Sequence, residues 1–548
     1  MAKSASEQQI LELKDTILQL NTTIKTLNEL IESLRKDKEM SAQENANLKA
    51  QLEYMKHKMF GSSSERRTDD ISGQLNLFND KEVPAVVIEP EFTDVTVLSK
   101  KKVRKPKLSY DEQFANIKER DEVVDTLSDD DKICPLCGTD MVPIGKELIR
   151  SEVLYHRAYL ERVNYYATTY ECPSCKETEE PQFIKDNGVP ALIPNSYASP
   201  SLVANTMYEK FVNSKPLYRQ EKDFANFGVT ITRSAMAYWI IYSADNYLKP
   251  ICDYLKKQLL KRNYLCADET PIQVLKEPGR RAQAKSYIWL IRTGDDGLPT
   301  IITFNYTPTR AGVNAEKFLQ NAPDGFYLMV DGYQGYNKVT NAKRCCCYAH
   351  IRRYLIEAIP KGHESDYTDP AVQGVLYCNK LFAYERSYKE KGLSYKQIYN
   401  RRLKDEKPVV EAFLAWAGKQ PSVRGTRLHR ALTYINNCKP YMMTYLEDPH
   451  CSLSNNISEN SVRPVTIGRK NYLFSDTQEG AHANMMVYTL IETAKAHGVN
   501  PYWYLQHLLE MRPSKKMSDE ELENLCPWSE SVKAACENLA KINSDINL

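Results

Sequence analysis

Hydrophobic residues recur in strict seven-residue steps near the start of the chain. Isoleucine and leucine alternate at the two core positions of this repeat, at Ile10, Leu13, Ile17, Leu20, Ile24, Leu27, Ile31 and Leu34. The repeat predicts a leucine-zipper coiled coil within residues 1–60, and isoleucine at the first core position favours two parallel strands, so we expect a homodimer. The alternative is a long amphipathic helix packed within its own chain. We favour the zipper because a two-position seam is narrower than the face that usually covers a globular core.

The hydrophobic period is lost after Gly61, and residues 61–125 are predicted to form a linker. Residues 100–107, KKKVRKPK, carry six positive charges in eight positions. Such a run can neutralise DNA phosphates without regard to base sequence. A solvated hinge is the alternative, and both interpretations stay open. The candidate DNA-binding residues of this run are Lys101, Lys102, Arg104 and Lys105.

Two C-x-x-C pairs follow the linker, CPLC at 134–137 and CPSC at 172–175. The alternating stretch between them predicts two strands that return the second pair to the first. Four thiolates at this spacing can close a tetrahedral shell around one structural Zn²⁺, which leaves no position for a substrate. A redox pair or unliganded core cysteines are the alternatives. We therefore predict a zinc-binding β domain over residues 126–195, with ligands Cys134, Cys137, Cys172 and Cys175.

Residues 196–260 have the pattern of successive helices. Two helices are expected around SPSLVANTMYEKFV and LYRQEKDFANFG, and after a turn at 226–228 a third begins near Thr232. Two short helices joined by a glycine turn, the second opening on a threonine cap, are typical of a helix-turn-helix, which would put Arg233 and Ser234 near a DNA groove. Three-helix packing without DNA is an equally weighted alternative.

From Asn263 the pattern changes to strands. Three apolar runs, a helix and a fourth apolar run follow one another, which is the opening order of an RNase H-like fold. Asp268 interrupts the first run and Asp331 closes the fourth. A carboxylate in a buried strand is costly unless it is paired or binds a cation. Strands one and four of that fold lie side by side, so we expect both carboxylates to meet within a catalytic core that begins over residues 261–350.

Composition adds limits to this picture. The 548 residues predict three or more units, and the chain as a whole is expected to be a multidomain α+β protein. With 73 basic and 71 acidic residues the net charge is +2, so DNA contacts must come from local patches. No apolar run approaches about 20 residues and the start has no apolar signal core, so a cytoplasmic protein with reduced thiols is expected.

Four stretches of the chain resemble a known family. CADETPIQVL, LMVDGYQGYN, CYAHIRRYL and SNNISENSVRPVTIGRKNYLFSDTQEGAHA are similar to blocks of the bacterial transposases of insertion sequence sixty-six type elements, a branch of the DDE transposases. The resemblance implies that Asp268 and Asp331 are the two catalytic aspartates and Glu459 the glutamate. It also implies a helical insertion over 351–450, a second part of the core over 451–495 and a C-terminal helical region over 496–548. Ser458 and Asn460 flank the glutamate where the family more often has alanine and arginine.

The resemblance further implies cleavage and joining of DNA at terminal inverted repeats. Two Mg²⁺ (or Mn²⁺) ions would be held by Asp268, Asp331 and Glu459, because hard cations take oxygen ligands. DNA, a second copy of the chain and accessory proteins of the same element are the expected partners. An RNase H-like nuclease or resolvase, and a catalytically dead DNA-binding repressor, are the alternatives. Glu269 is a weaker candidate ligand, since the next residue along a strand points to the opposite face.

Cationic groups near the expected triad are candidates for positioning DNA on its phosphates. They are His350, Arg352 and Arg353, and then Arg463, Arg469 and Lys470. For the first group an ordinary charged helix start is an equally good interpretation. Cys345, Cys346 and Cys347 precede His350, and we expect them in the core, because successive side chains on a strand cannot all reach one ion.

Overall fold

The computed structural model describes residues 118–156, 159–174, 182–186 and 188–546, together with Ser109, Glu112 and Phe114. Three of the predictions therefore lie outside the described residues. They are the leucine zipper of residues 1–60, the basic run with Lys101, Lys102, Arg104 and Lys105, and the fourth zinc ligand, Cys175.

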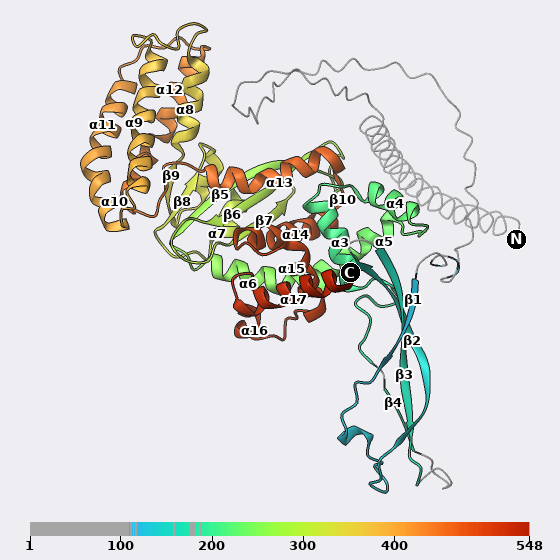
Figure 1. The fold of residues 1–548 in the computed structure, drawn as a ribbon. Helices are drawn as coiled ribbons and strands as arrows, with labels where there is room; N and C mark the ends of the chain where they lie inside the picture. Colours follow the sequence, from blue (N-terminus) through green and yellow to red (C-terminus); the bar gives the residue numbers. More distant parts are fainter. Residues whose placement is uncertain are drawn as a thin grey trace, which may run out of the picture.

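A mixed sheet of six strands forms the centre of the molecule (Figure 1). Its order is β7-β6-β5-β8-β9, and the short β10 pairs with the far end of β5. β6 runs antiparallel to both of its neighbours, β5 and β7, whereas β8 and β9 run parallel to β5. The strands are β5 (Tyr264–Lys276), β6 (Lys285–Thr293), β7 (Ile302–Thr307), β8 (Phe326–Val330), β9 (Ala342–Cys346) and β10 (Ser475–Thr477). The predicted sequence of three strands, a helix, α7 (Gly312–Leu319), and a fourth strand beside the first is confirmed.

The outer edge of the sheet is closed by α14 (Gln478–Ala496). Thr489 Oγ1 accepts a hydrogen bond from Phe304 N at 3.0 Å, and Thr493 Oγ1 accepts one from Ile302 N at 3.2 Å. The two threonines lie one helical turn apart and so bind alternate residues of β7. An edge strand otherwise exposes unpaired N–H groups, so this contact both fixes the helix and protects the edge.

The predicted helices before the sheet are present. They are α3 (Pro200–Phe211), α4 (Leu217–Asn226), α5 (Arg233–Ser243) and α6 (Lys249–Leu259), with a π-helical turn η2 (Ala244–Leu248) before α6. Gly228 has φ +75° in the turn after α4, and Thr232 Oγ1 caps α5 by accepting from Ala235 N. α3 is almost wholly buried and packs against α15 (Pro501–Met511). These helices share one hydrophobic core with the sheet and the C-terminal helices, which end with α16 (Asp519–Glu523) and α17 (Glu530–Ile546).

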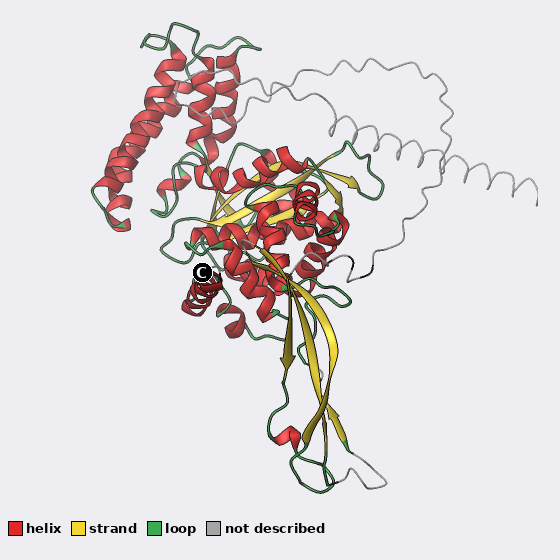
Figure 2. Cartoon of the chain, turned by 45° about the vertical axis from the view of Figure 1, so that its right-hand side comes forward, coloured by secondary structure: helices red, strands yellow, loops and turns green. Residues whose placement is uncertain are grey.

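A helical insertion stands beyond β9, at the opposite edge of the sheet (Figures 1 and 2). It has its own hydrophobic core, which includes Leu355, Cys378, Leu381, Phe413 and Ile435. Its helices are α8 (Tyr348–Ala358), α9 (Pro370–Glu390), α10 (Tyr395–Arg401), α11 (Lys407–Ala417) and α12 (Arg427–Cys438). The prediction that this stretch is mostly helical is confirmed, and the chain then returns to the sheet through α13 (Asn456–Tyr472).

A long β arm projects from the helical body (Figures 1 and 2). Its strands are β1 (Lys118–Val124), β2 (Val142–His156), β3 (Tyr159–Glu171) and β4 (Phe183–Lys185), in the order β1-β3-β2 with β4 pairing β3. β2 and β3 are the two antiparallel strands predicted between the cysteine pairs. None of the helices in the described part of the chain has the length and apolar composition needed to cross a membrane.

β1 corrects the linker prediction, because residues 118–124 belong to the arm rather than to an irregular segment. The strand KERDEVV has no apolar alternation, so its pattern gave no sign of a strand. Charge pairing with β3 replaces apolar packing: Glu119 forms an ion pair with Arg162, and Arg120 Nε lies 3.5 Å from Glu161 Oε1. Cross-strand pairs of opposite charge stabilise neighbouring strands, and the correct partner is visible only once the strands are placed.

Candidate active site

Two acidic residues come level at the ends of the central parallel strands. β5 and β8 pair in parallel with Cys266 opposite Met329. Two residues further along each strand, Asp268 and Asp331 therefore lie side by side. Asp331 directly follows the last residue of β8, and its Oδ1 accepts a hydrogen bond from Tyr333 N at 2.8 Å. The expected meeting of the two carboxylates follows from this register.

Glu459 lies in the first turn of α13, within the range at which its negative charge acts on Asp268. Arg292 on β6 donates from Nη1 to Ile457 O at 3.1 Å and to Ser461 Oγ at 2.7 Å, which fixes the start of the helix. Asn455, just before the helix, donates from Nδ2 to Ala267 O at 2.8 Å, next to Asp268. The helix start is thus tied to two strands, and Glu459 is aimed by these contacts.

Burial and the neighbouring acidic residues both affect the pKa of Asp268. Burial raises the pKa of Asp268 well above its ordinary value, and the negative charges of Glu269, Asp331 and Glu459 raise it further. Carboxylates that share a site repel one another, and a divalent cation between them removes that repulsion. The oxygen donors match the preference of Mg²⁺ or Mn²⁺. This set of residues therefore fits such an ion.

Glu269 is occupied by other partners. Its carboxylate lies 2.5 Å from Arg310 Nη2 and accepts a hydrogen bond from Tyr336 Oη at 2.6 Å. Burial raises the pKa of Glu269, and the charge of Asp331 adds to this. Because Arg310 and Tyr336 already satisfy its oxygens, Glu269 serves as part of the wall beside Asp331.

The first group of predicted phosphate-binding residues lies at the start of α8. His350 lies beside the acidic cluster, with Nδ1 3.6 Å from Glu459 Oε1, and burial together with Arg353 lowers the pKa of its imidazole. Arg352 donates from Nε to Asn379 Oδ1 at 2.7 Å. Cys345, Cys346 and Cys347 are buried, as expected. They face different neighbours: Cys345 lies near Cys451, whereas Cys347 accepts a hydrogen bond from Asn455 N at 3.1 Å.

The second cation group lies along α13. Arg469 donates from Nη1 to Thr270 Oγ1 at 3.0 Å and to Pro271 O, so it holds α13 against β5. Arg463 lies one turn after Glu459 and is part-buried, and Lys470 is exposed. Arg233, at the start of α5, is exposed and lies over the ring of Tyr218. Arg463, Lys470 and Arg233 therefore stay candidates for DNA contact, and Arg469 has a structural role as well.

Three of the predicted zinc ligands meet at the open end of the β2–β3 hairpin. One ligand atom from each of Cys134, Cys137 and Cys172 lies within 4.8 Å of the others, and Cys137 Sγ is 3.5 Å from Cys172 Sγ. Thiolates around one Zn²⁺ lie about 3.8 Å apart when each is about 2.3 Å from the metal. Hydrogen bonds from Thr139 lower the pKa of Cys137 to about 6, and those to the other cysteines assist. The arrangement fits a zinc ion.

Removal of one thiol from this group tests the zinc prediction. Full-length protein dialysed against a weak chelator is expected to keep about one zinc per chain, and Cys172→Ser is expected to lose it. Cys252→Ser is the matched control, because the Cys252 thiol faces the carbonyl of Met486. Elemental analysis measures both variants. Zinc content equal in Cys172→Ser and Cys252→Ser would disprove the shared thiolate site.

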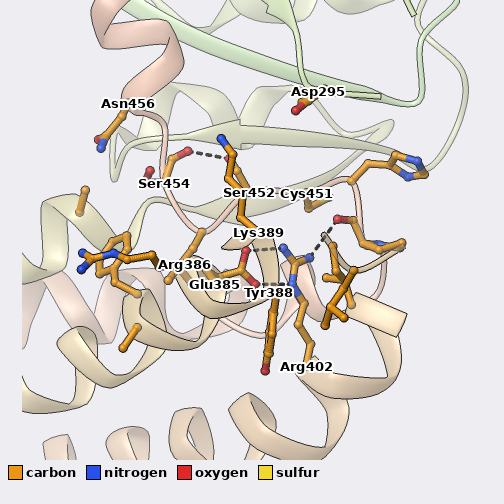
Figure 3. Close-up of a pocket in the computed structure, with 18 of the residues that line it drawn as sticks. Asp295, Glu385, Arg386, Tyr388, Lys389, Arg402, Cys451, Ser452, Ser454 and Asn456 are labelled. Atoms are coloured by element: carbon orange, nitrogen blue, oxygen red, sulfur yellow. Dashed lines mark hydrogen bonds and ion pairs between the residues drawn. The ribbon is translucent and has the colours of Figure 1, made fainter. Parts of the chain in front are cut away.

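A hollow of about 1190 Å³ lies between the helical insertion and the segment that leads into α13 (Figure 3). Arg386 and Lys389 of α9 line one side, and Ser452, Ser454 and Asn456 line another. No ion pair within the described part of the chain involves Arg386 or Lys389. At its base, Arg402 binds Glu385 through two hydrogen bonds of 2.7 and 2.9 Å. The hollow is a cationic recess next to the helix that carries Glu459.

Sequence reasoning missed the residues that position the acidic group. Arg292 and Asn455 hold the start of α13. Arg310 neutralises Glu269, and Tyr336 donates a hydrogen bond to it. An arginine inside the apolar strand KSYIWLIRTG was a usable signal, since buried arginines require partners. The identity of those partners, more than 160 residues later for Arg292, depends on the fold.

Family models match the chain in four regions. The model described as Transposase IS66 family matches residues 195–483, and the IS66 C-terminal element matches 489–528. The zinc-finger binding domain of transposase IS66 matches residues 131–176. The model described as Transposase C of IS166 homeodomain matches residues 47–110.

Uncharacterized proteins of Sinorhizobium fredii are similar along much of the chain. The protein y4qI is 26% identical over 355 residues, which cover 62% of this chain and 64% of y4qI. The protein y4hP is 23% identical over 510 residues, which cover 88% of each chain. The chain thus spans slightly less than two thirds of y4qI and most of y4hP.

Proposed function

The chain belongs to the IS66 transposase family, and from that premise we propose that it cleaves DNA strands at the terminal inverted repeats of an insertion sequence and joins them to target DNA. The observation that carries the proposal is the pairing of β5 with β8, which brings Asp268 level with Asp331. Glu459, on α13, lies near enough for its charge to add to those that raise the pKa of the buried Asp268. The strand order β7-β6-β5-β8-β9, antiparallel and then parallel, supports an RNase H-like core.

Asp268, Asp331 and Glu459 are proposed to hold two divalent cations of the Mg²⁺ or Mn²⁺ class. When bound, such ions lower the pKa of an attacking water or 3′-hydroxyl and stabilise the leaving oxygen. The protein's own part is to keep Asp331 and Glu459 near Asp268 although their charges repel one another. Arg292, Asn455 and Arg469 do this by fixing α13 on β5 and β6.

Phosphate binding is assigned to the cations around this point. Arg463 follows Glu459 by one turn on the same face of α13, and Lys470 is exposed further along the helix. Arg386 and Lys389 line the recess that adjoins the start of α13, which suits a DNA strand leaving the site. α4, its glycine turn and α5 are proposed to contact DNA through Arg233 and Ser234, and the run with Lys101, Lys102, Arg104 and Lys105 to add salt-dependent affinity.

One assay distinguishes the proposed transposase from the two alternatives, a resolvase-like nuclease and a DNA-binding repressor. Purified full-length protein is incubated with Mg²⁺ or Mn²⁺ and with DNA that carries the element's ends. A transposase nicks the ends and joins the freed 3′-hydroxyl to a target, a resolvase-like nuclease only cleaves, and a repressor only binds. Joined products support the proposal, whereas binding without cleavage would replace it with the repressor. The reaction is proposed to occur in the bacterial cytoplasm, with accessory proteins of the element as further partners.

Deletion of residues 1–60 tests the proposed dimer. Eight isoleucines and leucines of the heptad pattern would be removed, so light scattering is expected to change from a dimeric to a monomeric mass. Replacing Ile17 and Ile24 with lysine is the milder variant, since charged residues at core positions disrupt the seam. A dimer that survives both changes would place the interface elsewhere in the chain.

A further inference from the structure

Three ligand atoms of different chemistry meet at the Glu459 end of the acidic cluster. One atom from each of Cys347, His350 and Glu459 lies within 4.8 Å of the others. The three residues come from the cap of α8, its first turn and the first turn of α13. Cys347 is 0% exposed, and the side chains of His350 and Glu459 are 15% and 24% exposed. A largely enclosed set of sulfur, nitrogen and oxygen donors has therefore been assembled from two separate segments.

The contact between His350 and Glu459 has the geometry of two ligands and not of a hydrogen bond. His350 Nδ1 lies 3.6 Å from Glu459 Oε1, beyond the 2.7–3.2 Å range of N–H···O hydrogen bonds. Two ligand atoms each about 2.1 Å from one tetrahedral ion lie about 3.4 Å apart. His350 Nδ1 is buried and has no hydrogen-bond partner in the described part of the chain. A buried ring nitrogen aimed at a carboxylate without bonding to it leaves room for an ion between them.

The third donor is supported by a neighbour. Asn455 N donates a hydrogen bond of 3.1 Å to Cys347 Sγ. Backbone donors to a sulfur ligand are typical outer-shell contacts of metal sites, because they orient the sulfur and stabilise its charge. Asn455 is also the residue tied to Ala267 O, beside Asp268. The same residue thus orients the sulfur and links the set to the aspartates.

We propose that Cys347, His350 and Glu459 form a site for a borderline transition-metal ion of the Zn²⁺ or Co²⁺ class, adjoining the oxygen-rich site of Asp268 and Asp331. Soft and borderline donors select such ions over Mg²⁺. Three protein ligands leave a fourth position open, which is typical of sites that admit water or substrate. Glu459, with two carboxylate oxygens, would then be shared between this site and that of the two aspartates. The existence of this metal site does not depend on the proposed function, whereas a role for the ion in catalysis does.

Zinc content tests the site directly. Full-length protein is equilibrated with Zn²⁺ in excess Mg²⁺ and then analysed for bound zinc. The parent is expected to hold about two zinc ions per chain, one of them in the Cys134–Cys172 cluster, and His350→Ala and Cys347→Ser about one, a twofold loss. His429→Ala is the matched control, because His429 lies on α12 and its ring contacts Ser422. Equal zinc in the parent, His350→Ala and Cys347→Ser would overturn the proposal.

Cobalt supplies a readout that does not depend on activity. In a Cys172→Ser background, Co²⁺ is expected to produce a sulfur-to-cobalt charge-transfer band that disappears when Cys347→Ser is added. Serine for cysteine changes the buried volume little, so the second variant is expected to remain folded, which circular dichroism checks. A band of unchanged intensity in the double variant would rule out Cys347 as a ligand. DNA cleavage is measured separately: a parent that binds the extra zinc but never cuts DNA would refute the proposed function and leave the metal site standing.

Discussion

Asp331→Asn is expected to reduce metal-dependent DNA cleavage by about a thousandfold or more, or roughly 4 kcal/mol of barrier. Asp331 lies level with Asp268 at the end of the paired strands β5 and β8, so its carboxylate is one of two that a shared cation would contact. Asparagine keeps the shape and the hydrogen bond from Tyr333 N but removes the charge. Gel analysis of nicked and joined DNA measures the effect, and DNA binding by the same variant is expected to stay at the parent level.

In metal-free buffer, Asp331→Asn is not expected to lower the thermal stability of the protein, although it lowers the cleavage activity. Burial, and after it the charges of Glu269 and Asp331, raise the pKa of Asp268, so the folded protein suffers carboxylate repulsion when no cation is bound. Asp331→Asn relieves that repulsion and is expected to match or exceed the parent in thermal stability. Functional sites commonly carry such a stability cost. Cleavage at the parent rate by a folded Asp331→Asn protein would remove Asp331 from the catalytic group.

Arg402→Met is expected to destabilise the helical insertion by about 3 kcal/mol, because it leaves the part-buried carboxylate of Glu385 and three backbone carbonyls without their buried cationic partner. Arg402 is 2% exposed, and its guanidinium binds both oxygens of Glu385. It also donates to the carbonyls of Tyr445, Asp448 and Pro449. The last two belong to the segment that leads into α13. Loss of Arg402 is therefore expected to loosen α9 and to reduce DNA cleavage as well, through displacement of Glu459.

The adjacent arginine provides the control. Arg401 is 55% exposed and lies 3.5 Å from Asp405, an i,i+4 surface pair of the kind worth about 0.5 kcal/mol. Urea unfolding and local hydrogen exchange in α9 and α11 compare Arg402→Met with Arg401→Met. Equal and small effects of the two changes would show that the buried arginine does not hold the insertion to the core.

Local patterns were sufficient where neighbours in sequence are neighbours in space. The apolar runs predicted β5, β6, β7 and β8. The strand order of an RNase H-like fold predicted that the strands bearing Asp268 and Asp331 are neighbours. Alternation between the two cysteine pairs predicted the β2–β3 hairpin. Helix spacing, a glycine turn and a threonine cap predicted α4 and α5. Each of these signals is a period or a turn residue within one short segment.

Local patterns did not predict the charged strand β1 or the arginines that bind around the acidic residues. β1 is held by ion pairs with β3, and a charged residue in the sequence does not show which residue it will pair with. Arg469 was expected to bind DNA, yet it donates to Thr270 and Pro271 of β5. Arg292 and Arg310 stand far from their partners in sequence. Long cationic side chains adapt to whatever acceptor the fold brings near, so their roles cannot be assigned from spacing.

By itself, the sequence determined the two cysteine pairs, the strand positions of Asp268 and Asp331 and the order of strands and helices, because these depend on local composition and period. Glu459 was indicated only by the resemblance to a known family. The tertiary structure alone decided how α13 is oriented. Arg292 of β6 binds Ser461, whereas Asn455 and Arg469 bind Ala267 and Thr270 of β5, and each contact joins residues more than 160 positions apart. It also brought His350 and Cys347 to Glu459 across more than 100 residues and the whole helical insertion. Contacts of this kind depend on chain closure and packing, which no short window of sequence contains.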